Sequence, residues 1–195
     1  MTIRTLSILQ DEHQALAAML RSLSMMLAHA RRHGALPDFD VLRAMLFYID
    51  EFPERRHHPK ESQLLFPLLR ERAPALAPVL DRLDADHARG EHAIRALEHA
   101  LLAFEVMGPA RRENFEAAVR RYIDFYLGHM ALEEEAVLPV ARQVLGPADW
   151  AVLDEAFAAD ADPLTGHAPS DARNDEYRAL FQRIAMAAPA PIGLG

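Results

Sequence analysis

The stretch His57-His58-Pro59-Lys60-Glu61 places a histidine and a glutamate four residues apart, and the same H-x-x-x-E spacing returns at His129 and Glu133. In both places a proline follows ten residues after the histidine, at positions 67 and 139. Residues four apart on an α-helix lie about 40° apart around its axis and about 6 Å apart along it, so each pair shares one helix face. The recurrence predicts two related helices that each bring an imidazole and a carboxylate to one site.

The recurrence belongs to an internal repeat of two helix pairs. Apolar residues recur at steps of three and four, as in a helix that packs in a bundle. The two patterns superpose at a separation of 74 positions, which aligns His13 with His87 on inward helix faces. Short connections between the helices predict an all-α, up-down-up-down four-helix bundle. The predicted helices cover residues 5–33, 38–72, 74–107 and 109–145.

The second predicted helix contains two more residues than the fourth. The separation of equivalent positions falls from 74 to 72 between Phe52 and His57. Pro53 lies in this interval, removes a backbone donor and crowds the preceding turn. We therefore expect a kink, a bulge or a short break between Phe52 and His58 that absorbs the extra residues.

Composition limits the classes of protein that this chain can belong to. Its 195 residues include no cysteine, which excludes disulfides and thiolate metal sites, and its net charge of −8 argues against a nucleic-acid partner or an anionic membrane surface. The chain shows neither a signal-peptide pattern nor an apolar run of the roughly 18 residues that span a membrane. We therefore expect a cytoplasmic protein.

Two regions are expected along the chain. Residues 1–145 are predicted to form the bundle, and residues 146–195 a C-terminal helical extension. This tail is predicted to contain short helices at about 147–158 and 171–187. It is expected either to cap the bundle or to form the contact of a homodimer.

Four histidines and two glutamates fall on the inward faces of the four helices. Buried imidazoles and carboxylates need partners. A pair of metal ions would provide them, each held by one histidine from each helix of a pair, with the two glutamates bridging. Imidazole and carboxylate without sulfur suit iron, manganese or zinc, and bridging carboxylates favour di-iron or di-manganese. The six residues are His13, His57, Glu61, His87, His129 and Glu133.

The chain resembles the hemerythrin-like HHE cation-binding domain over about residues 5–145. The resemblance is carried by Asp11-Glu12-His13, by His57-His58-Pro59-Lys60-Glu61 with Leu65-Phe66-Pro67, by Asp86-His87, and by His129 and Glu133 with Leu138-Pro139. It implies a non-haem centre of two iron ions, Fe²⁺ or Fe³⁺ with an oxo or hydroxo bridge, in preference to manganese or zinc. It also implies that His13, His57 and Glu61 serve one iron. The other iron would be served by His87, His129 and Glu133, and both glutamates would bridge.

Such a centre implies a protein that meets O₂, NO or peroxide in sensing, storage or a stress response. Two alternatives stay open: a di-iron oxidase or peroxidase with turnover, and a metal-dependent interaction module whose tail passes a signal to a protein partner. Oxygen-carrying hemerythrins have a further histidine four residues after the one on the third helix, where this chain has Glu91. Glu91 is a candidate ligand that would favour the oxidised metal over reversible O₂ carriage. An ion pair with Arg95 explains it equally well.

The remaining polar residues near the predicted ligands have less specific roles. His58 and His92 are expected to lie beside the ligands or toward solvent, and it stays open whether Glu91, His58 or water fills the remaining coordination position. Tyr122 and Tyr126 are expected to pack in the core, with a place in an O₂ pocket as the alternative. Ligating histidines usually donate their second N–H to a carboxylate or carbonyl, which makes Glu12 and Asp86 candidates. Residues expected on the surface are His29, His33, His99, His167, Glu134 and Glu135.

Overall fold

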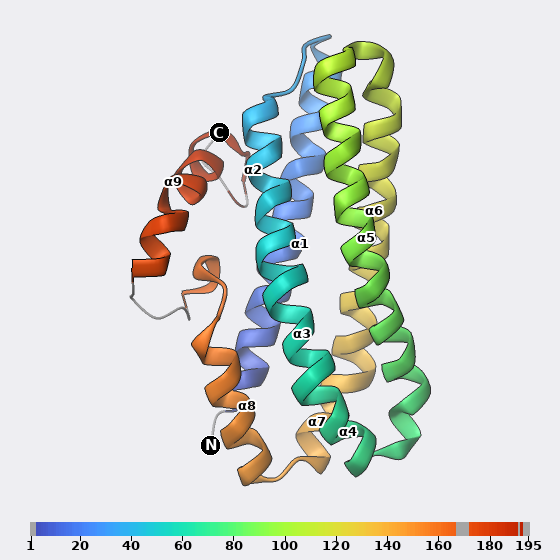
Figure 1. The fold of residues 1–195 in the computed structure, drawn as a ribbon, viewed down its shortest axis with the longest axis vertical. Coiled ribbons are helices and arrows are strands. Elements are labelled where there is room, and N and C mark those ends of the chain that lie inside the picture. Colours follow the sequence, from blue (N-terminus) through green and yellow to red (C-terminus); the bar gives the residue numbers. More distant parts are fainter. Residues whose placement is uncertain (1–2, 167–171, 191, 193–195) are drawn as a thin grey trace.

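The computed structural model describes residues 3–166, 172–190 and 192, and every regular element within them is helical. The all-α prediction is confirmed. Long helical stretches lie side by side, and the chain reverses direction at short connections between them (Figure 1). The first stretch is α1 (Arg4–Arg32). The second comprises α2 (Phe39–Ile49), η1 (Asp50–His57), α3 (His58–Lys60), η2 (Glu61–Leu65) and α4 (Phe66–Arg72).

The third and fourth stretches each begin with a short 3₁₀ turn. They comprise η3 (Pro74–Leu76) with α5 (Ala77–Met107), and η4 (Pro109–Arg111) with α6 (Arg112–Leu132), η5 (Glu133–Val137) and α7 (Leu138–Val144). Proline suits these first turns because its missing N–H would have no partner there. The second stretch is capped by Asp38, whose carboxylate accepts the Val41 N–H at 3.1 Å. Gly108 ends α5 with a φ of 79°, which glycine adopts without strain.

The second and fourth stretches contain π-helical turns, in which an N–H bonds to the carbonyl five residues earlier. The Phe66 N–H bonds to Glu61 in η2, and the Leu138 N–H bonds to Glu133 in η5, so both halves of the repeat contain this turn. The second stretch has a further π segment, η1, where the His58 N–H bonds to the Pro53 carbonyl. The two extra residues are therefore absorbed as a widening of the helix, and the chain stays helical through the predicted kink.

The interior consists of two apolar clusters with a polar layer between them. One cluster contains Leu16 and Ile94 together with apolar residues of α2 and α6, and the other contains Leu9 and Leu83 together with apolar residues of α4 and α7. On α1 the residue between the clusters is His13, and on α5 it is His87. The candidate site therefore lies across the middle of the bundle, closed above and below by apolar side chains.

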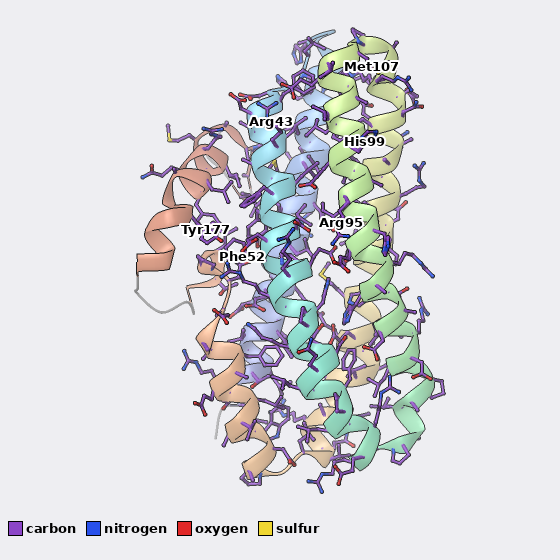
Figure 2. The ribbon with its side chains drawn as sticks, viewed as in Figure 1. Arg43, Phe52, Arg95, His99, Met107 and Tyr177 are labelled. Carbon is purple, nitrogen blue, oxygen red and sulfur yellow. The ribbon has the colours of Figure 1, made fainter. Side chains whose placement is uncertain are left out.

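The tail packs on the bundle as further helices. It contains α8 (Pro147–Ala159), a 3₁₀ turn η6 (Pro163–Thr165) and α9 (Ala172–Ala187), close to the predicted helix bounds. The α8 side chain Asp154 accepts the Thr5 N–H of α1 at 2.7 Å. Where α9 lies beside the second stretch, Phe52 and Tyr177 meet with ring centroids 5.1 Å apart (Figure 2). His167, predicted on the surface, lies outside the described residues. None of the described helices combines the length and apolar character needed to cross a membrane.

Candidate metal centre

One group of potential ligands comes from the first, second and fourth of the long helical stretches. His13, His57, Glu61 and Glu133 are buried, and each offers a ligand atom within 4.8 Å of the others. The Nε2 atom of His57 lies 3.0 Å from Oε1 of Glu61, and Nε2 of His13 lies 3.3 Å from Oε2 of Glu133. These four side chains present two nitrogen and two carboxylate ligands to one point.

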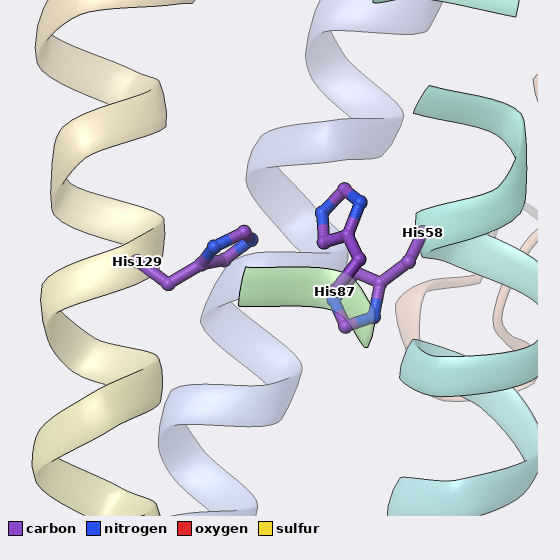
Figure 3. A group of neighbouring side chains, drawn as sticks. All are labelled: His58, His87 and His129. Carbon is purple, nitrogen blue, oxygen red and sulfur yellow. The ribbon is translucent and has the colours of Figure 1, made fainter. Parts of the chain in front are cut away.

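A second group consists of three histidines from three different stretches. His58 of α3, His87 of α5 and His129 of α6 are buried, and their ring nitrogens lie within 4.8 Å of one another (Figure 3). Glu61 connects the two groups because its Oε2 lies 3.3 Å from Nε2 of His87 while its Oε1 faces His57. This is the arrangement that a carboxylate bridging two cations requires.

The buried polar atoms at the centre lack hydrogen-bond partners within the described chain. They are His57 Nε2, His87 Nε2, both ring nitrogens of His129, and all four carboxylate oxygens of Glu61 and Glu133. Several lie close to one another without hydrogen-bond geometry. Leaving such groups unpaired in the interior costs several kcal/mol in total, because each loses about 1–3 kcal/mol of solvation. The residues therefore fit bound cations, which would provide partners for the atoms that face the centre.

The ring nitrogens on the outer side have polar neighbours, which is typical of histidines that bind metal. Nδ1 of His57 lies 2.6 Å from Glu12, and Nδ1 of His13 lies 2.9 Å from Glu134. Nδ1 of His129 lies 4.0 Å from Asp86, beyond hydrogen-bond distance. For His58 and His87 the neighbours are Glu54 at 3.1 Å and Ser62 at 2.9 Å. In four of the five histidines this contact leaves Nε2 to face the centre.

Burial and neighbouring charges shift the pKa values of the buried histidines and glutamates at the site. Burial alone would lower the pKa of His13, but the neighbouring carboxylates of Glu133 and Glu134 outweigh burial and raise it to about 9. Burial and neighbouring histidines lower the pKa of His58 well below its ordinary value and that of His129 to about 2. Burial and the charge of Glu61 raise the pKa of Glu133 to about 7. His58 and His129 are therefore neutral, which is the form that binds metal.

The structure brings six of the seven predicted ligands into these groups, with two differences. Glu133 lies with His13 and His57, although it was expected beside His87 and His129. Glu91 does not reach the site: its side chain is 49% exposed and pairs with Arg95. One turn after His87, the residue of α5 that faces inward is Gly90. Glu91, the next residue, therefore faces outward. The ion-pair alternative for Glu91 is the correct one.

Sequence reasoning left open whether His58 fills the remaining coordination position, and the structure buries His58 in the three-histidine group. The two extra residues in the second helix were the available signal, because a widened turn changes which residues face inward. Tyr122 and Tyr126 are buried in the core as expected, and both also donate to Glu54, which was not predicted. Glu12 is an outer partner as expected, but of His57 and not of its neighbour His13.

Several residues expected on the surface or near the ligands are placed by the structure as follows. His29, His33, His92 and His99 are exposed, and so is Glu135. Glu134 is also exposed, but it reaches Nδ1 of His13 from the solvent side. It therefore contributes to the site although it lies on the surface.

The tail closes one side of the site. Asp162, between α8 and η6, is buried, and its N–H donates to Glu12 at 2.8 Å while its carboxylate accepts from the Tyr48 hydroxyl. A cavity between this loop and the site is lined by His13, His57 and Phe52 among others. About 10 Å³ of it admits the centre of a water-sized molecule, which is room for roughly one such molecule. The cavity therefore leaves space for one small molecule beside His13 and His57.

The fold and this histidine and carboxylate centre agree with a comparison against protein families. The model of the family described as hemerythrin HHE cation binding domain matches residues 4–141. The chain belongs to this family of cation-binding domains, and the matched segment contains every member of both groups. No curated protein and no solved structure matches the chain.

Replacing Glu12 with glutamine is expected to weaken metal binding about 10- to 100-fold, the usual effect of losing an outer partner of a ligating histidine. Both Glu12 oxygens accept hydrogen bonds, from the Asp162 N–H and His57 Nδ1, and an amide can accept only one of them. Competition with a metal-binding dye measures the affinity. Glu155→Gln, an exposed change on α8, serves as the control, and equal affinities in both variants would contradict the prediction.

Proposed function

We propose that this protein binds two iron ions at the centre of an up-down-up-down bundle of hemerythrin type. His13, His57 and Glu133 would hold one ion and the three-histidine group the other, with Glu61 bridging both. The observation that carries the proposal is the set of orphaned nitrogen and carboxylate atoms that converge on one buried point. Imidazole and carboxylate ligands inside a four-helix bundle are a known setting for di-iron centres.

We further propose that the centre meets O₂, NO or peroxide in sensing, storage or a stress response. Iron with an open position would supply the binding and redox chemistry for such ligands. The chain's own contribution is to orient the histidines through Glu12 and Glu134, to exclude bulk water with the apolar clusters, and to admit one small molecule through the cavity beside His13.

Metal analysis of protein purified without added metal tests this proposal. Two iron ions per chain are expected, and zero metal or one zinc would contradict it. Optical spectra then separate the roles: a reversible band with O₂ favours carriage, a band with NO or peroxide favours sensing, and catalytic loss of peroxide favours an enzyme. His57→Ala and His129→Ala should each lower the metal content, and two metals in both variants would show that the ligand assignment is wrong.

A metal-dependent interaction module is the second candidate, and one observation favours it. Asp162 of the tail bonds to Glu12, and Glu12 bonds to His57, so the tail is two hydrogen bonds away from a candidate ligand. Fixing the orientation of His57 therefore also favours the hydrogen bond that holds the tail against the bundle. In this candidate, residues 1–145 bind the metal, and residues 146–195 present a surface to a protein partner or to a second copy of the chain.

Limited proteolysis between α8 and α9 measures this link. We expect the metal-loaded protein to be cleaved about 5- to 10-fold more slowly than the metal-free protein, since one buried hydrogen bond contributes about 1 kcal/mol. Tyr48→Phe removes the hydroxyl that donates to Asp162 and should reduce the difference. Equal cleavage with and without metal would remove the support for the second candidate.

A further inference from the structure

The π segment η1 brings a buried carboxylate, Glu54, against His58. Oε2 of Glu54 lies 3.1 Å from Nδ1 of His58, and Oε1 accepts the Tyr122 hydroxyl at 2.8 Å and the Tyr126 hydroxyl. Glu54 is 6% exposed and lies one residue after Pro53, inside the interval that contains the two extra residues. A carboxylate with three donors around it is held in one orientation.

The surrounding residues are shaped for this contact. The His58 ring stacks between His87, with centroids 4.3 Å apart, and Tyr126, with centroids 5.6 Å apart. On the facing helix, Gly90 leaves the space that the Tyr126 hydroxyl occupies. A Cβ atom there would lie 1.8 Å from that oxygen and 3.1 Å from Glu54 Oε1. Any larger residue at this position would displace the tyrosine that holds Glu54.

This arrangement exists in only one half of the internal repeat. His58 corresponds to Met130 in the other half, at the separation of 72 that relates His57 to His129. The region of α6 equivalent to η1 contains no π-helical turn. The site is therefore asymmetric although the sequence repeat is nearly symmetric, and the asymmetry comes from η1.

We propose that Glu54 is a positioning residue that makes His58 the fifth histidine ligand of the metal centre. Glu54 accepts the Nδ1 proton of His58, so Nε2 carries a lone pair and faces His87 and His129 (Figure 3). Tyr122 and Tyr126 hold Glu54 in place, and Gly90 makes room for them. This inference rests on the proposed dinuclear centre and specifies how its three-histidine position is built.

Glu54→Gln tests the inference because it keeps the shape of the side chain. If the amide oxygen accepts from the two tyrosines, the amide NH₂ faces His58, and the imidazole must move its proton to Nε2, where it blocks the metal. Iron content and affinity are measured after anaerobic addition of Fe²⁺ to the full chain. We expect one ion per chain to keep wild-type affinity and the second to bind about 10- to 100-fold more weakly.

His58→Ala should lose the same ion, and the matched control is Glu51→Gln, a change on the same π segment at a residue that pairs with Arg56 and not with a histidine. In protein loaded with Co²⁺, whose paramagnetism shifts nearby protons, His58→Ala should lack one exchangeable imidazole N–H signal. In Glu54→Gln that signal should be lost or exchange faster. A purely structural role for Glu54 would leave this signal unchanged.

The possible failures are distinguishable. If the wild-type chain binds fewer than two ions, the proposed function fails and this inference fails with it. If the wild-type chain binds two ions and both Glu54→Gln and His58→Ala also bind two at wild-type affinity, only the positioning role is overturned. Equal losses in Glu51→Gln would also overturn it. Should Glu54→Gln not fold, Tyr126→Phe keeps the ring, removes one donor to Glu54, and is expected to weaken the same ion.

Discussion

Replacing Glu61 with glutamine is expected to reduce the metal content from two ions per chain to one or none. Among the described residues, Glu61 is the only carboxylate that contacts both groups. One of its oxygens lies 3.0 Å from His57, and the other lies 3.3 Å from His87. Glutamine is neutral and has a single oxygen ligand. Breaking one side of a buried charge arrangement costs about 3–5 kcal/mol, which corresponds to a roughly 100- to 4,000-fold loss of affinity.

Metal content and competition with a chelator of known affinity measure this loss. Glu135→Gln is the matched control, because it makes the same chemical change on the same π-helical turn as Glu133 at an exposed position. Two ions bound by Glu61→Gln at wild-type affinity would show that this carboxylate does not bridge.

Removing the metal from the wild-type chain is expected to lower its melting temperature by about 8–16 °C. A ligand present at 1,000 times its Kd stabilises the folded state by about 4 kcal/mol. For a chain of this size each kcal/mol shifts the melting temperature by about 2–4 °C. The physical reason is that the metal-free centre leaves buried carboxylates and imidazoles without partners. Differential scanning calorimetry with and without a chelator measures the shift.

The metal-free Glu133→Gln variant separates this cause from general damage to the fold. In the metal-free wild type, the buried carboxylates of Glu61 and Glu133 lie close together, and their negative charges repel one another. Burial and the charge of Glu61 disfavour the charged form of Glu133, so replacing Glu133 with neutral glutamine should leave the metal-free variant as stable as the metal-free wild type or more stable. A metal-free variant that melts well below the metal-free wild type would contradict this account.

Helical periodicity in the sequence was sufficient to predict the long helices and the segments that connect them. Steps of three and four residues place Leu9 and Leu16 on either side of His13 on one face of α1, and the structure buries all three. The α5 stripe is equally regular, from Leu83 through His87 to Ile94. These positions were predictable because an undistorted helix fixes the angle between residues at given spacings.

Prediction failed where the helix changes its pitch. In a regular helix the inward face would continue from Glu133 to Ala136 and Val140, but the structure buries Val137 and Ala141 instead. The π turn η5 lies between, and its wider loop moves the inward face by one residue. The same shift after Glu61 buries Leu69, where a regular helix would bury Leu68. Single-residue shifts of this kind cannot be read from apolar periodicity alone.

The sequence by itself determined the helices, the repeat, and six polar residues that share one layer of the bundle. The spacing of these residues on each helix can be read from the sequence. The repeat likewise shows which residues of the two halves are equivalent, and neither observation needs a tertiary contact. Only the tertiary structure decided how these residues divide into groups, because that depends on the rotation of each helix against its neighbours. It moved Glu133 beside His13, turned His58 inward through η1, and turned Glu91 out to Arg95. It also connected Asp162 of the tail to the site, a contact across the chain that no local pattern encodes.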